Sequence, residues 1–268
     1  MSLFYEGLFF IAGTIAGSFL NVCIYRIPRG KSILSPSSHC PACGHKIRPI
    51  DNIPLLSYIL LKGKCRSCKK KISLRYPLVE LITGLLWVQL YNHFGLTFQL
   101  IPGLFFVTLL VVLAAIDYDT NLIPNKIMLP AIAISFIFTV LYVLKIKSVP
   151  IIANAGVGWS VAGFFIGGGL LYLIAIIASA VFRKDAMGGG DIKLAAFAGL
   201  YLGGYILLAL FIGFFLGAIV GIILIAKDKS KSMSKTMPFG PFIAAGSIIT
   251  LFFGLQLWSK YLALAGLS

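Results

Sequence analysis

The run FFVTLLVVLAAI at residues 105–116, closed by Asp117, decides what kind of protein this chain forms. It belongs to a long apolar segment, and about 20 such residues suffice for a helix to cross a bilayer. A carboxylate at the bilayer centre costs roughly 2.5–3.5 kcal/mol, so intramembrane aspartates usually face a bundle interior or an aqueous cavity. Asp191 follows three glycines and opens a second apolar run. We therefore expect Asp117 and Asp191 to form a carboxylate pair that carries chemistry.

The composition indicates an all-α polytopic membrane protein. The chain has 268 residues, of which 59% are hydrophobic and 12% are charged, whereas about a quarter of the residues in a soluble domain are charged. We predict about eight transmembrane helices, and we expect the first to be retained because no cleavable signal-peptide pattern is visible. Glycines in the fifth span favour close helix packing. The predicted spans are 3–25, 77–95, 98–117, 125–144, 153–182, 192–206, 208–226 and 238–258.

The net charge of +15 reflects membrane topology rather than nucleic-acid binding. Cytosolic loops of membrane proteins are enriched in Lys and Arg. With eight spans, twenty of the 23 basic residues fall on one side, and only Lys145, Lys147 and Lys260 fall on the other. This asymmetry predicts a cytosolic first loop and two external termini, and it argues against the alternative that 192–226 is one long tilted helix. We expect the lipid bilayer, and no nucleic acid, as a partner.

This topology divides the chain into three parts. Residues 1–25 form the first transmembrane helix, residues 26–76 form a small cytosolic loop domain, and residues 77–268 form a multi-helix membrane domain. The loop is the only sizeable part of the chain that we expect outside the membrane.

The loop contains two Cys-x2-Cys pairs, Cys40 with Cys43 and Cys65 with Cys68. Paired knuckles of this kind predict a four-thiolate zinc site. A metal would hold together a loop that is too short to build a large core. Because four sulfurs close the coordination sphere, such a zinc ion is structural rather than catalytic.

Other uses of the cysteines and their neighbours remain open. A disulfide or redox role is the weaker alternative, because the cytosol keeps thiols reduced. His39 and His45 flank the first pair and can serve as ligands, but four cysteines suffice, so we expect both at the surface. We expect Cys23, in the first span, to be a small buried packing residue.

Asp119 is the nearest competitor of Asp117. It lies two residues further on, about 200° around a continuing helix, so the two carboxylates cannot face one cavity unless the helix unwinds. The alternative is that Asp119 lies in a solvated turn or caps the next helix. Pro124 is well suited to the start of that helix.

Asp191 opens the sixth span, where Gly188, Gly189 and Gly190 let a peptide or a helix approach the backbone closely. A helix N-cap is the alternative for this residue. Topology predicts that both Asp117 and Asp191 lie at the cytosolic face. Two close carboxylates cannot both ionise cheaply, so one holds the proton. The ionised one can then deprotonate a water while its partner polarises a carbonyl.

In their order and spacing, the motifs of this chain resemble those of the type IV prepilin peptidases, which are bacterial membrane aspartic proteases. Each short motif is weak alone, but the set runs nearly from end to end and is highly specific. The resemblance rests on residues 17–22 and 26–28, the paired cysteines, residues 75–80, Asp117 with Pro124, residues 188–191 and residues 238–241.

The resemblance implies an aspartic endopeptidase of the Gly-x-Gly-Asp type, with Asp117 and Asp191 as its catalytic residues. Its substrates are prepilins and pseudopilins, which it recognises through their N-terminal helix and short basic leader. The paired cysteines are similar to those of bifunctional members, which then methylate the new N-terminal amine with S-adenosyl-L-methionine. The resemblance places the protein in the bacterial cytoplasmic (inner) membrane, with the zinc loop and the active site facing the cytosol.

Glu80 is the weak candidate for a contact with the methyl donor or the new amine, since it is the only acid near the cytosolic start of the second span. A pairing with Arg75 is the alternative for this residue. Asn21, Arg26 and Asp51 are further candidates for the methylation chemistry.

Three other functions fit parts of the pattern. The protein can be a peptidase without methylation, an ion or solute carrier whose aspartates bind a cation, or a scaffold built around the zinc module. Carriers often show inverted repeats and helices broken at the midplane, whereas these aspartates lie at one predicted face. In a scaffold, the aspartates would be dispensable and the cysteines would not.

Overall fold

The computed structural model describes residues 2–143, 157–183, 188–227 and 237–266. Lys145, Lys147 and residues 228–236, which lie between the last two predicted spans, are outside these ranges. Contacts divide the chain into two compact units, Met1–Leu100 and Ile101–Ser268. This division falls between Leu100 and Ile101. It does not test the predicted domain boundaries at residues 25 and 76, which stay a prediction.

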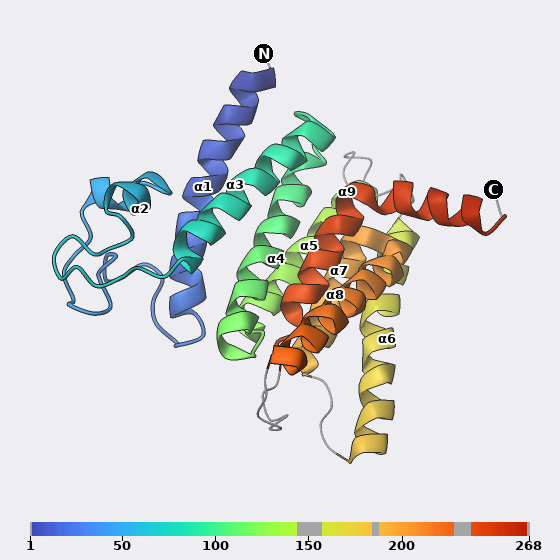
Figure 1. The fold of residues 1–268 in the computed structure, drawn as a ribbon. Coiled ribbons are helices and arrows are strands. Elements are labelled where there is room, and N and C mark those ends of the chain that lie inside the picture. The colour runs from blue at the N-terminus through green and yellow to red at the C-terminus, as the bar shows by residue number, and fades with distance from the viewer. Residues whose placement is uncertain (1, 144–156, 184–187, 228–236, 267–268) are drawn as a thin grey trace. The chain divides into compact units, whose positions relative to one another are not determined.

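Each predicted span coincides with a helix, which confirms the all-α polytopic class (Figure 1). Five stretches of the described chain are long and apolar enough to cross a membrane: α1, α4, α6, the segment Gly189–Lys227 and α9. The helices are α1 (Ser2–Arg26), α2 (Leu56–Leu60), α3 (Arg75–Phe94), α4 (Leu100–Thr120), α5 (Asn125–Val143), α6 (Val157–Phe182), α7 (Gly189–Leu202), α8 (Ile206–Lys227) and α9 (Gly240–Leu264), with short 3-10 helices η1 (Pro49–Asn52) and η2 (Gly203–Tyr205).

A break separates α7 from α8, so the predicted division of residues 192–226 is confirmed, although it falls a few residues earlier than expected. Gly203 ends α7 with a φ of 58°, a conformation that glycine adopts without steric cost. The indole of Trp159, on α6, lies so close to Gly203 and Gly204 that neither position has room for a Cβ. The break is therefore held in place by packing as well as by backbone conformation.

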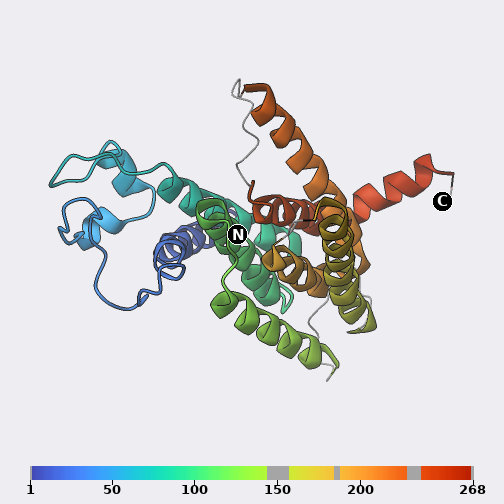
Figure 2. The same cartoon turned by 90° about the horizontal axis from the view of Figure 1, so that it is seen from below.

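In the first unit, α1 and α3 pack side by side, as both ribbon views show (Figures 1 and 2). Glycines on α1 allow this close approach. A Cβ on Gly13 would lie 2.8 Å from the Cα of Gly84, and a Cβ on Gly17 would lie 2.7 Å from the Cα of Glu80. Small residues serve this purpose in lipid, where the hydrophobic effect does not drive helices together.

In the second unit, α6 packs against α7 and α8 packs against α9. The backbones of Gly163 on α6 and Gly199 on α7 touch, which confirms that glycines of the fifth predicted span serve close packing. The centre of this unit is aromatic, because the ring of Phe106 stacks on Tyr201 with centroids 4.4 Å apart. The buried Tyr201 hydroxyl pairs with the Ser135 hydroxyl at 2.9 Å, so its polar end is satisfied.

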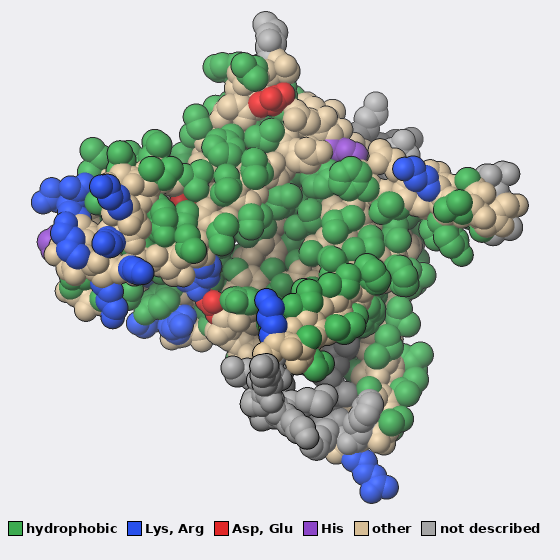
Figure 3. Space-filling model, viewed as in Figure 1, with side chains coloured by type: hydrophobic (Ala, Val, Ile, Leu, Met, Phe, Trp, Pro, Cys, Tyr) green, Lys and Arg blue, Asp and Glu red, His purple; other side chains and the backbone are tan. Residues whose placement is uncertain are grey.

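The surface of the chain separates apolar from basic regions. Large hydrophobic side chains are exposed along the long helices, for example Phe211, Phe215 and Ile222 on α8, as expected for helices that face lipid tails. Figure 3 shows Lys and Arg side chains gathered over the loop between α1 and α3. The exposed basic residues there include Lys46, Arg48, Lys62, Lys64, Arg66, Lys69, Lys70 and Lys71.

We expect Gly163→Ala to destabilise the second unit, because its new Cβ would collide with the backbone of Gly199. Overpacking of this kind costs about 1–3 kcal/mol. The matched control is Gly169→Ala in the same helix, where a Cβ meets no atom of the described residues within 4 Å. Thermal unfolding of the two purified variants in detergent measures the difference. Equal stability of the two variants would contradict the proposed packing.

Candidate functional site

The two Cys-x2-Cys pairs form knuckles with the same backbone geometry. The N–H of Cys40 donates to the carbonyl of His45, and the N–H of Cys65 donates to the carbonyl of Lys70, both at 2.9 Å. Each knuckle turns through a residue with positive φ, Gly44 in the first and Lys69 in the second. An isolated β-bridge flanks each one, His39 with Lys46 and Lys64 with Lys71.

These knuckles bring four sulfur atoms together. The ligand atoms of Cys40, Cys43, Cys65 and Cys68 all lie within 4.8 Å of one another, and the Sγ atoms of Cys40 and Cys68 are 3.9 Å apart. A tetrahedral site with metal–sulfur bonds of about 2.3 Å has sulfur–sulfur distances of about 3.8 Å. The spacing of the cluster is therefore close to that of a tetrahedral metal site.

Backbone N–H groups favour the thiolate form of Cys65, and an ion pair holds the second knuckle in place. Backbone N–H groups of Cys68 and Ser67 lower the pKa of the Cys65 thiol to about 7. Arg66 makes two hydrogen bonds to Asp51, from Nε at 2.8 Å and from Nη2 at 2.6 Å, and its guanidinium lowers the pKa of the Asp51 carboxyl. This ion pair ties the second knuckle to η1, so Asp51 serves the module itself.

The neighbouring His and Cys residues lie where the sequence predicts. His39 and His45 are exposed, and the metal-binding group found among the described residues contains the four cysteines alone. Cys23 is buried within α1, as expected for a packing residue.

Asp117 lies in the last turn of α4 and is 5% exposed. Its Oδ2 accepts a hydrogen bond from the backbone N–H of Gly240 at 2.8 Å. Asp119 is exposed, and α4 continues to Thr120 without unwinding, so the two carboxylates diverge as predicted. The difference in exposure therefore distinguishes Asp119 clearly from the buried Asp117.

Asp191 is the third residue of α7, and Gly188 is the N-cap, so the N-cap alternative for Asp191 is wrong. The side chain is partly buried, and its charge interacts with that of Asp117. The glycines before it allow the loop after α4 to approach, because a Cβ on Gly190 would lie 2.8 Å from the Cβ of Ile123. The structure thus brings together the two aspartates that the sequence singles out.

Gly240 is the part of this site that the sequence reasoning missed. It is the first residue of α9, and a Cβ there would lie 2.7 Å from the Asp117 Oδ2. Figure 1 shows the end of α4 and the start of α9 at the same end of this unit. The available signal was the Pro-Phe-Gly-Pro run at 238–241, which marked a helix start without revealing the contact with Asp117.

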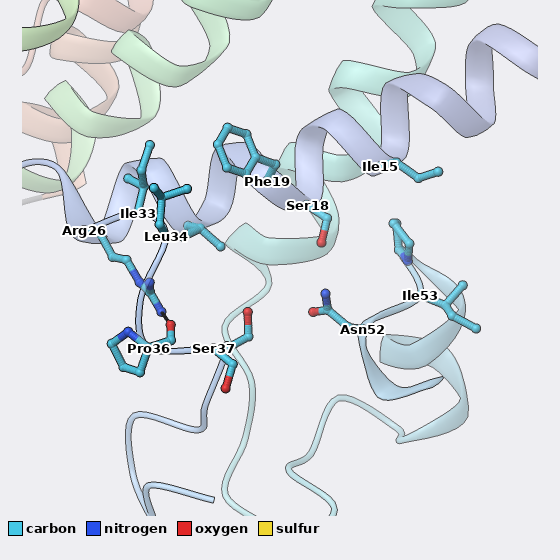
Figure 4. A pocket seen from close by; sticks show the side chains of 13 residues that line it. Ile15, Ser18, Phe19, Arg26, Ile33, Leu34, Pro36, Ser37, Asn52 and Ile53 are labelled. Carbon is cyan, nitrogen blue, oxygen red and sulfur yellow. Dashed lines mark hydrogen bonds between the residues drawn. The ribbon is translucent and has the colours of Figure 1, made fainter. Parts of the chain in front are cut away.

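The candidates for methylation chemistry lie in the first unit. Glu80 is 9% exposed, and its Oε2 accepts a hydrogen bond from the N–H of Leu55 at 2.9 Å. Arg26 is 7% exposed and ties the loop after α1 by donating to the carbonyls of Ser32 at 3.0 Å and Pro36 at 2.6 Å. Figure 4 shows this tie at the edge of a cavity of about 550 Å³. Arg26 therefore has a structural role.

The fold and these sites define a polytopic membrane protein with a four-cysteine module and two neighbouring aspartates at helix ends. Residues 11–94 match the Bacterial Peptidase A24 N-terminal domain, and residues 104–222 match the Type IV leader peptidase family. The chain therefore belongs to the type IV leader peptidase family, and the predicted resemblance is confirmed. The gap between the two matches contains the boundary between the two compact units.

Several relatives carry the name prepilin leader peptidase/N-methyltransferase. The relative from Bacillus subtilis is 35% identical over 259 residues, which cover 96% of this chain and 98% of the relative. The relative from Pseudomonas aeruginosa is 34% identical over 286 residues, with 96% and 93% covered. A relative from Myxococcus xanthus is 40% identical over 197 residues, or 72% of this chain and 55% of that protein. No solved structure matches the chain.

We expect the purified wild-type protein to carry about one metal ion per chain, held by the four cysteines. Cys65→Ser should lose most of it, because a serine hydroxyl is a poor replacement for a thiolate. The control is Cys23→Ser, which changes a cysteine outside the cluster and should leave the metal content unchanged. Elemental analysis of the purified variants gives the metal-to-protein ratio. Full occupancy in Cys65→Ser would contradict the four-cysteine assignment.

Proposed function

We propose that this chain cleaves the leader peptide from prepilins and pseudopilins and then N-methylates the new N-terminus. The observation that carries the peptidase is the convergence of Asp117 and Asp191, from separate helices, beside the first N–H of α9. Family membership and the names of the relatives support the same activity.

We propose that Asp117 is the ionised member of the pair and Asp191 the protonated one. The N–H of Gly240 donates to Asp117, and a hydrogen bond donated to a carboxylate favours its charged form. Two neighbouring carboxylates share one proton, because ionising both is costly in a water-poor site. The hydrogen bond from Gly240 supports our proposal that Asp117 carries the charge.

Peptide cleavage follows from this assignment. Asp117 takes a proton from a water molecule, whose oxygen attacks the scissile carbonyl carbon, while Asp191 donates its proton to the carbonyl oxygen. Collapse of the tetrahedral intermediate breaks the C–N bond, the leaving amine takes the proton held by Asp117, and one hydroxyl of the intermediate returns its proton to Asp191. The leader departs as a carboxylic acid, and the mature chain keeps a free N-terminal amine.

We propose that the protein lies in the bacterial inner membrane and that cleavage takes place at its cytosolic face. The positive-inside rule supports this orientation, since twenty of the 23 basic residues fall on one predicted side. A substrate would place its apolar N-terminal helix in the bilayer and present its leader at the cytosolic end of that helix.

We propose zinc as the metal of the four-cysteine module, because four thiolates at tetrahedral spacing are its common structural site. S-adenosyl-L-methionine would supply an electrophilic methyl group to the amine that cleavage releases. Methylation is separable from cleavage. Mature substrates that never gain the mass of a methyl group would refute the proposed methylation without contradicting the proposed peptidase activity.

We expect Asp117→Asn and Asp191→Asn to lower prepilin cleavage by about 10²–10⁴-fold, the usual contribution of a general acid or base. Asp119→Asn is the matched control, because its carboxylate lies two residues from Asp117 and is exposed. Co-expression with a model prepilin, followed by mass measurement of the product N-terminus, reports cleavage. Normal processing by either of the first two variants would rule out the aspartyl mechanism.

We expect Gly240→Ala to slow cleavage roughly tenfold or more, because its Cβ would displace the Asp117 carboxylate and weaken a hydrogen bond to a charged group, which contributes about 1.5–3 kcal/mol. Gly221→Ala on α8 is the control, since a Cβ there meets no atom of the described residues within 4 Å. Single-turnover cleavage by purified protein in detergent measures both rates. A Gly240→Ala protein that cleaves at the Gly221→Ala rate would refute the charge assignment.

A further inference from the structure

The loop between α1 and α3 contains an uncharged stretch, residues 52–61, within an otherwise basic sequence. This stretch includes α2, which turns its apolar side chains outward. Leu56 is 58% exposed, Ile59 is 69% exposed and Leu60 is 77% exposed, whereas Ser57 is 7% exposed. A buried polar side chain beside exposed apolar ones departs from the usual surface pattern. Exposed apolar patches mark sites that contact another protein or a membrane.

The backbone of this stretch is paired within the protein, so it does not need water. The N–H groups of Ser57, Ile59 and Leu61 each donate to the carbonyl oxygen four residues earlier, at 3.0–3.1 Å. The Ser57 hydroxyl donates to the carbonyl of Ile50 at 2.9 Å. A chain that enters an apolar environment must satisfy its backbone groups internally, and these hydrogen bonds do so around α2.

Glu80 fixes the position of the stretch along α3. Its Oε2 accepts a hydrogen bond from the N–H of Leu55 at 2.9 Å. Leu55 has a φ of 60° and a ψ of −50°, a conformation that is strained for a leucine. Strain of this kind persists where the surrounding structure imposes it. The residue that precedes α2 is therefore held at the level of Glu80.

The level of Glu80 gives the depth of the stretch. In the proposed topology α3 crosses the bilayer, and its 20 residues extend about 30 Å at 1.5 Å per residue. The hydrocarbon core is also about 30 Å thick, so α3 needs its whole length and its first turn marks the boundary. Glu80 lies five residues after Arg75, or about 7.5 Å along the helix. The start of α2 therefore lies below this boundary.

The apolar side of the stretch continues the surface of a helix that is suited to lipid. A cavity of about 550 Å³ is lined by Ile15 and Phe19 of α1 and by Ile53 and Pro54 of the stretch (Figure 4). Ile15 is 57% exposed and Phe19 is 51% exposed, and α1 is long and apolar enough to cross a membrane. Lipid that covers these residues of α1 would cover the neighbouring stretch as well.

Basic side chains border the stretch. Lys62 and Lys64 follow it directly and are exposed. Amphipathic segments with this composition lie in the membrane interface, with their apolar side buried by about 5–10 Å. The cytosolic leaflet carries anionic lipids, which attract lysines beside such a segment. The depth given by Glu80 falls within the range expected for an interfacial segment.

We propose that residues 52–61 dip into the cytosolic leaflet and anchor the cysteine module to the surface of the bilayer. Leu56, Ile59 and Leu60 lie among the upper parts of the acyl chains, and the lysines that follow meet anionic headgroups. The choice of leaflet rests on the proposed orientation. The loop between α1 and α3 is thus bound to the membrane rather than free in the cytosol.

The test is the lipid contact of residue 59, measured on the full-length protein in vesicles of phosphatidylcholine and phosphatidylglycerol. Ile59→Trp adds one tryptophan to the three native ones, and its emission is the difference from the wild type. Bromine quenches tryptophan on contact, so acyl chains brominated near the headgroup report insertion at that depth. We expect most of the added emission of Ile59→Trp to be lost in such vesicles. His45→Trp, on the exposed first knuckle, is the control and should keep its emission.

An unchanged metal content in both variants shows that the module is folded. Equal quenching of the two variants would overturn the anchoring. Stronger quenching of Ile59→Trp by bromine at the chain ends than by bromine near the headgroup would also overturn it. A blue-shifted but unquenched Ile59→Trp would do the same, because protein, such as a second copy of the chain, would then cover the stretch. Wild-type vesicles that fail to cleave a model prepilin would contradict the proposed function without contradicting the anchoring.

Discussion

A hydrocarbon bilayer offers no hydrogen-bond partners, so polar groups among these helices are favoured where they pair inside the protein. Most do so, although the hydroxyls of Ser160, Ser247 and Thr250 have no partner among the described residues. The chain meets this constraint locally, as the Thr83 hydroxyl does by donating to the carbonyl of Val79 at 2.7 Å. It also meets it between helices, as Tyr201 does with Ser135. Asp117 is the most demanding case, and its partner is a backbone N–H at the start of α9 rather than a side chain.

The same constraint explains what could be predicted from the sequence. Apolar length and basic-residue asymmetry gave the spans, and the positions of Asp117 and Asp191 at segment edges singled out the pair. Spacing alone predicted that Cys40, Cys43, Cys65 and Cys68 would converge, because a knuckle is a local structure. These features depend on short stretches of chain, in which residue order determines geometry.

Individual backbone contacts between distant segments could not be predicted. Gly240 lies 123 residues from Asp117, and no periodicity links the two. Likewise, the contact of Glu80 with Leu55 depends on a strained turn whose positive φ falls on a leucine rather than a glycine. The second knuckle is a further example. Lys69 has a positive φ there, as Gly44 has in the first knuckle, but only the glycine is a residue type that predicts this conformation.

The shortness of α7 has a consequence for its place among the other helices. Its 14 residues span about 21 Å at 1.5 Å per residue, whereas the hydrocarbon core is about 30 Å thick. Residues 194–202 of α7 are buried against its neighbours, so its length need not match the bilayer as that of a lipid-facing helix must. The shortness of α7 is therefore compatible with a helix that is enclosed by the others and carries Asp191 at its start.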